Sequence, residues 1–299
     1  MSTPDDSAQI STNIAIWGPP GSGKTWLIHA LAKELSWYND RDSDFSYSLV
    51  DDTGVRLYPS PPNSVDQGAT MAPEDRVWTF ERKGKKQSQA HIISTQRHNI
   101  IVHDDKGQNL VDAVTPFVGQ SLTIETLRYS PNIIILLDPS TVKNLSISTP
   151  VPPPTVYEKH EYTELLLNLV NALAAQGVER HLAVCLSKSD LLNLILPVEE
   201  IVKACFGVDT LKVLQDPRIH TRFFRVSSVG FLRQPHGKKS PNITIEGKIS
   251  NEEVWEPFNV VSPFFWLFEA IERARIGGGN TLFSDRGKIY LPYPRPRIK

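Results

Sequence analysis

Eight residues near the start of the chain have the types and the spacing to hold a polyphosphate. They read Gly18-Pro19-Pro20-Gly21-Ser22-Gly23-Lys24-Thr25 and fit the pattern G-x-x-x-x-G-K-[ST]. In this pattern glycines let backbone N–H groups point at phosphate oxygens, the lysine reaches the β- and γ-phosphates, and the threonine hydroxyl holds Mg²⁺. The stretch therefore predicts a site for a nucleoside triphosphate and Mg²⁺. Its binding residues would be Gly18, Pro20, Gly21, Ser22, Gly23, Lys24 and Thr25.

The pattern has this meaning only between a strand and a helix, and the sequence offers both. Residues 13–17 are a short, mostly apolar run with the length of a buried strand, and residues 25–37 place leucine and isoleucine on one side of a helix. A helix that starts here adds its positive N-terminal end to the site. The alternative is an ordinary turn between a strand and a helix, but such a turn needs neither the lysine nor the threonine.

Three more polar clusters follow apolar runs. They read Asp104-Asp105-Lys106-Gly107-Gln108, Ser187-Lys188-Ser189-Asp190 and Ser227-Ser228-Val229. Each cluster begins at the end of a run that is typical of a strand. Ligands of parallel α/β sheets bind beyond the carboxyl ends of the strands. We therefore expect the four clusters to line one crevice.

The order of these segments predicts an α/β protein with the three layers of a P-loop NTPase, over residues 13–276. The sheet should be mostly parallel and six-stranded, with long loop insertions. Residues 133–137 are apolar at every position and are expected to form a central strand that is covered on both faces. Apolar residues at helical spacing predict further helices over 162–176, 197–207 and 262–275.

Polar, glycine-rich or proline-rich segments separate these elements. Loops are expected at residues 38–76, 104–128, 139–160 and 231–254. The third of these contains the run Pro152-Pro153-Pro154, which neither a central strand nor a helix interior accommodates, so it should be an exposed insertion. The two ends, residues 1–12 and 277–299, are expected to be disordered and flexible.

The composition excludes several classes of protein. A net charge of −1 creates no field that would attract nucleic acid or an anionic membrane, and a hydrophobic content of 40% is enough for a large core. The two cysteines, Cys185 and Cys205, lie in strand-like and helix-like segments and are expected to be buried thiols in a reducing compartment. No signal sequence and no membrane-spanning run is evident. We expect a cytoplasmic protein that binds no nucleic acid and has no membrane segment.

The order of the motifs resembles that of the Ras-like GTPases of the TRAFAC class of P-loop proteins, over roughly residues 13–275. Asp104-x-x-Gly107 is similar to the family's D-x-x-G, in which the aspartate holds Mg²⁺ through water and the glycine N–H senses the γ-phosphate. Gln108 stands where these enzymes keep the glutamine that orients the attacking water. The resemblance therefore implies Lys24, Asp104 and Gln108 as catalytic residues, and Gly107 as a nucleotide contact.

The metal would be held by Thr25, by Asp104 and by a threonine of the first switch loop. Thr70 is the residue we expect, with Thr53 and Thr79 as alternatives. By the same resemblance, residues 38–76 and 104–128 would be the two switch segments, which order with GTP and loosen with GDP.

Ser187-Lys188-Ser189-Asp190 is similar to the family's guanine motif, [NT]-K-x-D. A carboxylate such as that of Asp190 can accept hydrogen bonds from both N1–H and N2–H₂ of guanine, a pair of donors that adenine lacks. The aliphatic stem of Lys188 can cover the plane of the base. Ser227-Ser228-Val229 resembles the S-A-K loop, whose backbone N–H contacts the guanine O6. The chain departs from the family pattern where serine replaces Asn or Thr at 187, where valine replaces lysine at 229, and where Asp105-Lys106 replaces the common Thr-Ala inside D-x-x-G.

The resemblance implies a GTP-hydrolysing switch with GTP/GDP and Mg²⁺ as cofactors, which works with effector and GTPase-activating proteins. The long loops and the stretch Trp255-Glu256-Pro257-Phe258 also resemble the bacterial double-GTPase families. Two alternatives remain. The Pro19-Pro20 form of the P-loop is common in AAA+ ATPases, although no glutamate follows Asp104 or Asp138 as that chemistry requires. The chain could also be a scaffold that binds nucleotide without hydrolysing it.

Overall fold

The centre of the protein is a seven-stranded sheet with the strand order β2-β3-β4-β1-β5-β6-β7. A computed structural model describes residues 13–19, 21–41, 45–62, 74–84, 95–104, 130–145, 147, 149–150, 152–153, 156–175, 177, 179–192, 196–233 and 239–275. Strands β4, β1, β5, β6 and β7 run parallel, and β3 is antiparallel to its two neighbours β2 and β4. The strands are β1 (Ile14–Trp17), β2 (Phe45–Asp51), β3 (Glu74–Gly84), β4 (Thr95–Asp104), β5 (Asn132–Leu137), β6 (His181–Leu186) and β7 (His220–Arg225).

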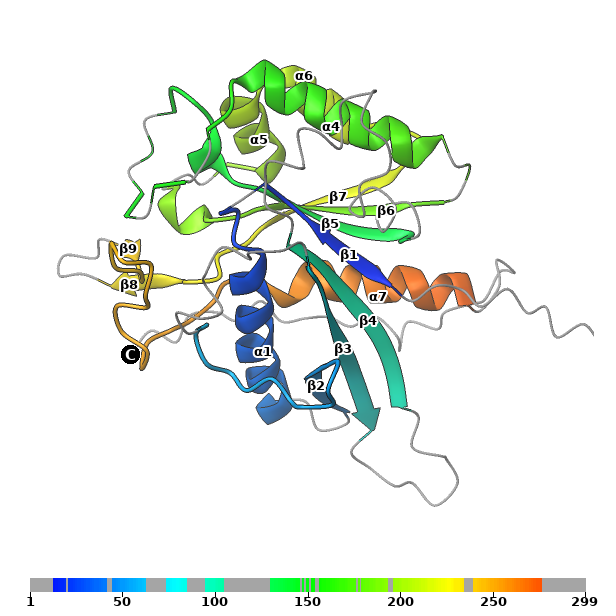
Figure 1. Ribbon diagram of the computed structural model, residues 1–299, viewed down its shortest axis with the longest axis vertical. Coiled ribbons are helices and arrows are strands. Elements are labelled where there is room, and N and C mark those ends of the chain that lie inside the picture. The colour runs from blue at the N-terminus through cyan, green and yellow to red at the C-terminus, as the bar shows by residue number, and fades with distance from the viewer. Residues whose placement is uncertain are drawn as a thin grey trace, which may run out of the picture.

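Helices cover both faces of this sheet (Figure 1). One layer contains α1 (Lys24–Arg41) and α7 (Val261–Arg275), and the other contains α4 (Lys159–Ala174), α5 (Val198–Phe206) and α6 (Val208–Leu214). Strand β1 shows how the core divides, because Ile14 and Ile16 belong to the cluster beneath α1 and α7, whereas Ala15 and Trp17 belong to the cluster beneath α4 and α5. The predicted three-layer, mostly parallel α/β architecture is confirmed.

The predicted count of six strands is wrong for the described residues, which form seven. The additional strand, β2, lies within the segment 38–76 that we expected to be a loop. Its apolar residues alternate, and Tyr47 and Leu49 are buried against the α1–α7 layer. The outer edge of β2 is also covered, because the Asn39 side chain bonds both backbone groups of Tyr47 and the Leu57 N–H donates to the Leu49 carbonyl.

Two other expected loops contain ordered structure. In the segment 139–160 the first three residues form the buried 3-10 turn η1 (Pro139–Thr141), and Val142 bridges to the buried Tyr157. The segment is therefore only partly an exposed insertion. In the segment 231–254, β8 (Phe231–Arg233) and β9 (Lys239–Pro241) form a small antiparallel sheet.

Both cysteines are buried free thiols, as predicted. No helix among the described residues has the length and apolar character to cross a membrane. The end segments 1–12 and 277–299, the expected strand at 91–93 and residues 105–128 lie outside the described residues.

A buried carboxylate on the helix after the P-loop anchors the last helix of the fold. Glu34 of α1 accepts a hydrogen bond of 2.7 Å from the N–H of Val261, the first residue of α7. Burial raises the pKa of Glu34 to about 7, although backbone N–H groups of residues 259–261 oppose the rise. The carboxyl group of Glu34 therefore ties the helix behind the P-loop to the N-terminal end of α7.

This anchor should make stability depend on pH. The folded protein keeps the Glu34 proton up to about pH 7, whereas the unfolded chain releases it near its ordinary pKa of 4.5. Glu34 therefore contributes fully below that lower value, and about 3 kcal/mol is lost as the pH rises through the folded pKa. Glu34→Gln keeps an acceptor but cannot ionise, so its free energy of unfolding should fall less than that of the wild type between pH 4.5 and 8 in urea titrations. Parallel curves for the two proteins would contradict this prediction.

Candidate functional site

The P-loop follows β1 and packs closely against the neighbouring strand β5. A Cβ added to Gly18 would lie 2.9 Å from the Leu136 Cβ and 3.2 Å from the Leu136 carbonyl oxygen, so only glycine fits there. Gly21 and Gly23 have φ values of 71° and 95°, in the left-handed region that favours glycine. These conformations turn the chain into α1, which begins at Lys24.

Two side chains of the loop are suited to bind an anion. Lys24 is 7% exposed, and its ammonium donates a 2.9 Å hydrogen bond to the carbonyl of Gly18, so the ammonium lies over the loop. The hydroxyl of Ser22 is buried and has no hydrogen-bond partner among the described residues. Thr25 lies in the first turn of α1, where a helix has N–H groups without intrahelical partners. The described residues therefore fit a polyphosphate and its metal ion, while Pro20 lies outside the described part.

The backbone of Asp104 ends β4 at the same edge of the sheet. Ile16 of β1 pairs with Val102 of β4, so two residues further along both strands Gly18 and Asp104 reach the same level. The structure describes only the backbone of Asp104, and the expected Gly107, Gln108 and Thr70 lie outside the described residues.

The two alternative switch threonines are badly placed for this edge. Thr79 pairs with Asn99, and the side chain of Asn99 bonds to that of Asn13 at the start of β1, the end opposite the P-loop. Thr53 is exposed next to the edge strand β2, where it bonds to Asp51. Neither residue lies next to the P-loop, so Thr70 stays the predicted switch threonine.

The guanine-type motif lies where β6 ends, and the S-A-K-like loop lies where β7 ends. The Ser227 hydroxyl donates a 2.6 Å hydrogen bond to the Asp190 carboxylate. Burial raises the pKa of Asp190, and this bond opposes the rise. The Ser189 hydroxyl donates to the carbonyl of Val226 at 2.8 Å, which joins the two loops a second time. Ser187 donates to the carbonyl of Leu137 at 3.2 Å and so braces the motif against β5.

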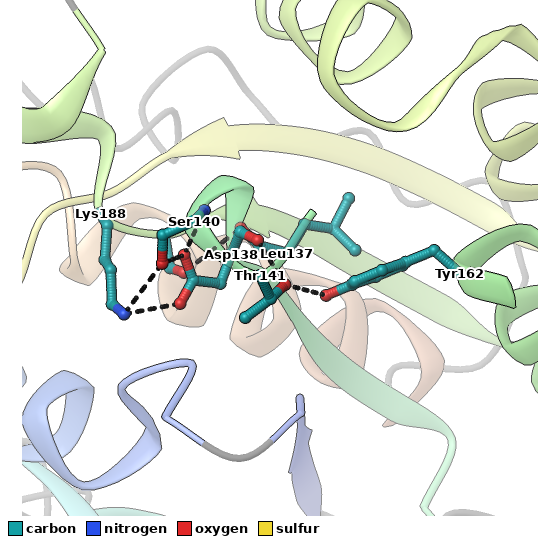
Figure 2. A network of polar contacts seen from close by, with 7 residues as sticks. Leu137, Asp138, Ser140, Thr141, Tyr162 and Lys188 are labelled. Atoms are coloured by element: carbon teal, nitrogen blue, oxygen red, sulfur yellow. Dashed lines mark hydrogen bonds and ion pairs between the residues drawn. The ribbon is translucent and has the colours of Figure 1, made fainter. Parts of the chain in front are cut away.

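Lys188 belongs to a polar network that the sequence did not reveal (Figure 2). Its ammonium lies 2.7 Å from Oδ2 of Asp138, a carboxylate that is fully buried just after β5. The other oxygen, Oδ1, accepts from the backbone N–H and the hydroxyl of Ser140 at 2.9 and 2.6 Å. Lys188 itself has a φ of 49°, so the ion pair holds a strained residue at the centre of the guanine-type motif. The only sequence signal for this partner was a carboxylate directly after a wholly apolar strand.

Breaking this pair should destabilise the fold. Asp138→Ala leaves the half-buried Lys188 ammonium with only the Ser140 hydroxyl and leaves the Ser140 N–H without its acceptor, so the free energy of unfolding should fall by about 3 kcal/mol. Asp209→Ala is the matched control, because its pair with Lys212 is exposed on both sides and should contribute far less. Denaturant unfolding of the two variants measures the difference. Equal losses in the free energy of unfolding would show that the buried pair stabilises the fold no more than the exposed one.

Contacts therefore run along the whole edge of the parallel strands. Gly18 packs on β5, Asp138 after β5 pairs with Lys188 after β6, and Asp190 accepts from Ser227 after β7. The structure brings together the P-loop, the guanine-type motif and the S-A-K-like loop, with the end of β4 beside the P-loop. This edge is the candidate nucleotide site.

No protein-family model matches the sequence, and a comparison with curated proteins finds no match. Among similar solved structures is the GTPase-like domain of S. cerevisiae Ski7 bound to GTP, with 13% identity and a TM-score of 0.39 over 91% of this chain and 52% of that one. The same domain bound to GDP and inorganic phosphate has 14% identity and a TM-score of 0.38, over 90% of this chain and 51% of that one. Sup35 complexed with GDP has 13% identity and a TM-score of 0.32, over 72% of this chain and 36% of that one.

The chain spans about half the length of the Ski7 chains that it matches. None of the three structures is described as a bacterial double-GTPase, so that resemblance stays a prediction. At this level of similarity, the nucleotides of those proteins do not decide what this chain binds, which depends on the residues of its own site.

Proposed function

We propose that this protein is a Mg²⁺-dependent molecular switch that binds GTP and GDP, hydrolyses GTP and acts through effector and GTPase-activating proteins. The observation that carries the proposal is the bond between Ser227 and Asp190 at the edge that also holds the P-loop. A carboxylate held in this way could bind a base whose phosphates lie in the P-loop. Guanine offers that carboxylate two adjacent donors, N1–H and N2–H₂, and adenine does not.

The residues of the chain divide the chemistry among them. Lys24 and the N–H groups of the P-loop would neutralise charge on the phosphates, and the hydroxyl of Thr25 would bind the metal. Mg²⁺, when bound, would draw charge from the β- and γ-phosphates, with Asp104 and Thr70 completing its site. Gln108 would orient water for in-line attack on the γ-phosphate, and Gly107 would sense that phosphate. With an arginine supplied by a partner, turnover of the isolated protein should be slow, about 10⁻⁴ to 10⁻² per second.

The alternative functions are an ATPase and a scaffold without hydrolysis. The ATPase alternative finds little support at the base site, because a half-buried carboxylate facing adenine would meet its acceptor N1 rather than a donor. The scaffold alternative differs from the switch only in lacking hydrolysis, which is assigned to residues 104–108. Kinetic measurements are needed to tell the two apart.

Equilibrium binding of fluorescent GDP and ADP to the purified protein tests the base. We expect affinity for GDP to exceed that for ADP by at least about a hundredfold, since a carboxylate left without its donor in the complex discriminates strongly. Micromolar binding of ADP with no binding of GDP would contradict the proposal.

Single-turnover hydrolysis of GTP tests the chemistry. The wild type should exceed the buffer background, and Gln108→Ala should fall toward it, by about tenfold to a hundredfold if the side chain orients the water. If both proteins stay at the background even with candidate partners added, the protein is a nucleotide-binding scaffold.

A further inference from the structure

We infer that residues 255–258 form a clamp that fixes the base-reading loop 227–230 from behind, and that the indole N–H of Trp255 is a positioning donor for guanine selectivity. We name residues 255–258 the clamp segment. The inference rests on the proposed function, since it concerns how the same site reads its base.

The clamp segment and the loop are joined at consecutive positions. The backbones of Ser227 and Phe258 exchange two hydrogen bonds, of 3.0 Å from the Ser227 N–H and 2.7 Å from the Phe258 N–H. The indole Nε1 of Trp255 donates a 2.8 Å hydrogen bond to the carbonyl of Ser228. Together they hold the backbone of two neighbouring loop residues.

Gly230, at the end of the loop, packs against the backbone of Glu256. Its φ is 72°, and a Cβ added there would lie 2.0 Å from the carbonyl oxygen of Glu256. Backbone therefore packs directly on backbone, and no larger residue can occupy the position without moving the loop away from the clamp segment.

Ser227 connects the clamped backbone to Asp190, the carboxylate that is proposed to bind the base. Its backbone is bridged to Phe258, while its hydroxyl accepts from the Gly230 N–H at 2.9 Å and donates to the Asp190 carboxylate at 2.6 Å. One residue thus belongs both to the clamped backbone and to the carboxylate's hydrogen-bond shell. A shift of the loop would turn the Asp190 carboxylate, and hydrogen bonds to guanine weaken steeply with angle.

The clamp segment is itself held in place by buried groups. Trp255 is 2% exposed, and its ring meets the edge of Trp26, which follows Thr25 on α1. The fully buried Asn242 exchanges hydrogen bonds of 2.9 Å with the backbone of Asn251, and its N–H donates to the carbonyl of Gly230. The segment that follows β8 is therefore folded back so that Trp255 reaches Ser228.

The contacts of the clamp segment also bear on Val229, which departs from the family pattern. At the position where the S-A-K loop has lysine, Val229 is 9% exposed, and its short apolar side chain offers the base no charge. The loop is instead positioned by its contacts with the clamp segment.

Trp255→Phe tests the inference, because phenylalanine keeps a buried ring and removes the indole N–H. The measurement is the dissociation constant for GDP and for inosine diphosphate, whose base has N1–H but no 2-amino group. We expect the wild type to prefer GDP by about tenfold, as one hydrogen bond to a charged acceptor allows. In Trp255→Phe the preference should fall to about twofold while the affinity for inorganic triphosphate is unchanged.

Trp266→Phe is the matched control. It makes the same chemical change on α7, where Trp266 packs on His181 at the start of β6 and on Phe224 of β7. A loss of structure alone would weaken both nucleotides and triphosphate together, whereas loss of positioning changes the ratio between the two bases. Gly230→Ala, which pushes the loop from Glu256, should lower the same ratio.

The outcomes separate this inference from the proposed function. If the wild type prefers GDP and both variants keep its ratio, the clamp is overturned and the proposed function stands. If the wild type binds no GDP at all, both are overturned.

Discussion

Replacing Asp190 by asparagine is expected to change the preferred base from guanine to xanthine. The carboxylate presents two acceptors, which match N1–H and N2–H₂ of guanine. If the asparagine oxygen keeps the hydrogen bond from the Ser227 hydroxyl, the amide nitrogen faces the base. It then opposes the guanine amino group and matches the carbonyl at the 2-position of xanthine. Affinity for GDP should fall by about 10²- to 10³-fold, because two hydrogen bonds to a charged acceptor are lost or become repulsive.

Calorimetric titration of wild type and variant with GDP, xanthosine diphosphate and ADP measures this change in the preferred base. Asp190→Ala is the control, since it can accept from neither base and should bind both weakly. An Asp190→Asn variant that binds GDP as the wild type does would mean that this carboxylate does not read the base. A variant that loses ADP instead would support the ATPase alternative.

Replacing Lys24 by alanine is expected to abolish tight binding of any nucleoside triphosphate. The ammonium is buried over the loop and can exchange its bond to the Gly18 carbonyl for charge-assisted bonds to phosphate. Losing two such bonds corresponds to a loss of affinity of about 10²- to 10³-fold. The free energy of unfolding should change little in the absence of nucleotide, because a buried ammonium is itself costly to desolvate.

Equilibrium binding of fluorescent GTP, with unfolding curves recorded on the same samples, checks both statements. Lys212→Ala removes an exposed lysine in the opposite helical layer and should leave binding unchanged. Undiminished binding by Lys24→Ala would place the phosphates elsewhere. This variant does not separate a switch from a scaffold, since both bind nucleotide; Gln108→Ala does.

The main elements of the fold could be predicted because their signals are local. Residues 133–137 are apolar at every position and form the buried β5, and the helix expected over 162–176 is α4. Strand β2 could not be predicted in the same way. It is an edge strand of alternating polar and apolar residues inside an Asp- and Ser-rich segment, and its burial depends on the α1–α7 layer.

The site could be predicted in its parts but not in its connections. The sequence indicated Lys188 as a base contact, and only the neighbouring strands β5 and β6 bring the buried Asp138 to its ammonium. It indicated Trp255 only as part of a stretch that resembles the bacterial double-GTPase families. The fold-back of the segment between β8 and α7 is what brings its indole to Ser228.

The P-loop, the order of the motifs and the class of fold could be predicted from the sequence, because each depends on residue types at short, regular spacing. The contacts between motif residues could not, because they depend on how the chain folds. Ser227 meets Asp190, Lys188 meets Asp138 and Trp255 meets Ser228 across 37, 50 and 27 positions of the chain. The physical reason is strand register, since parallel pairing brings loops distant in sequence to one edge, and no local pattern encodes which polar groups then fall within hydrogen-bond distance.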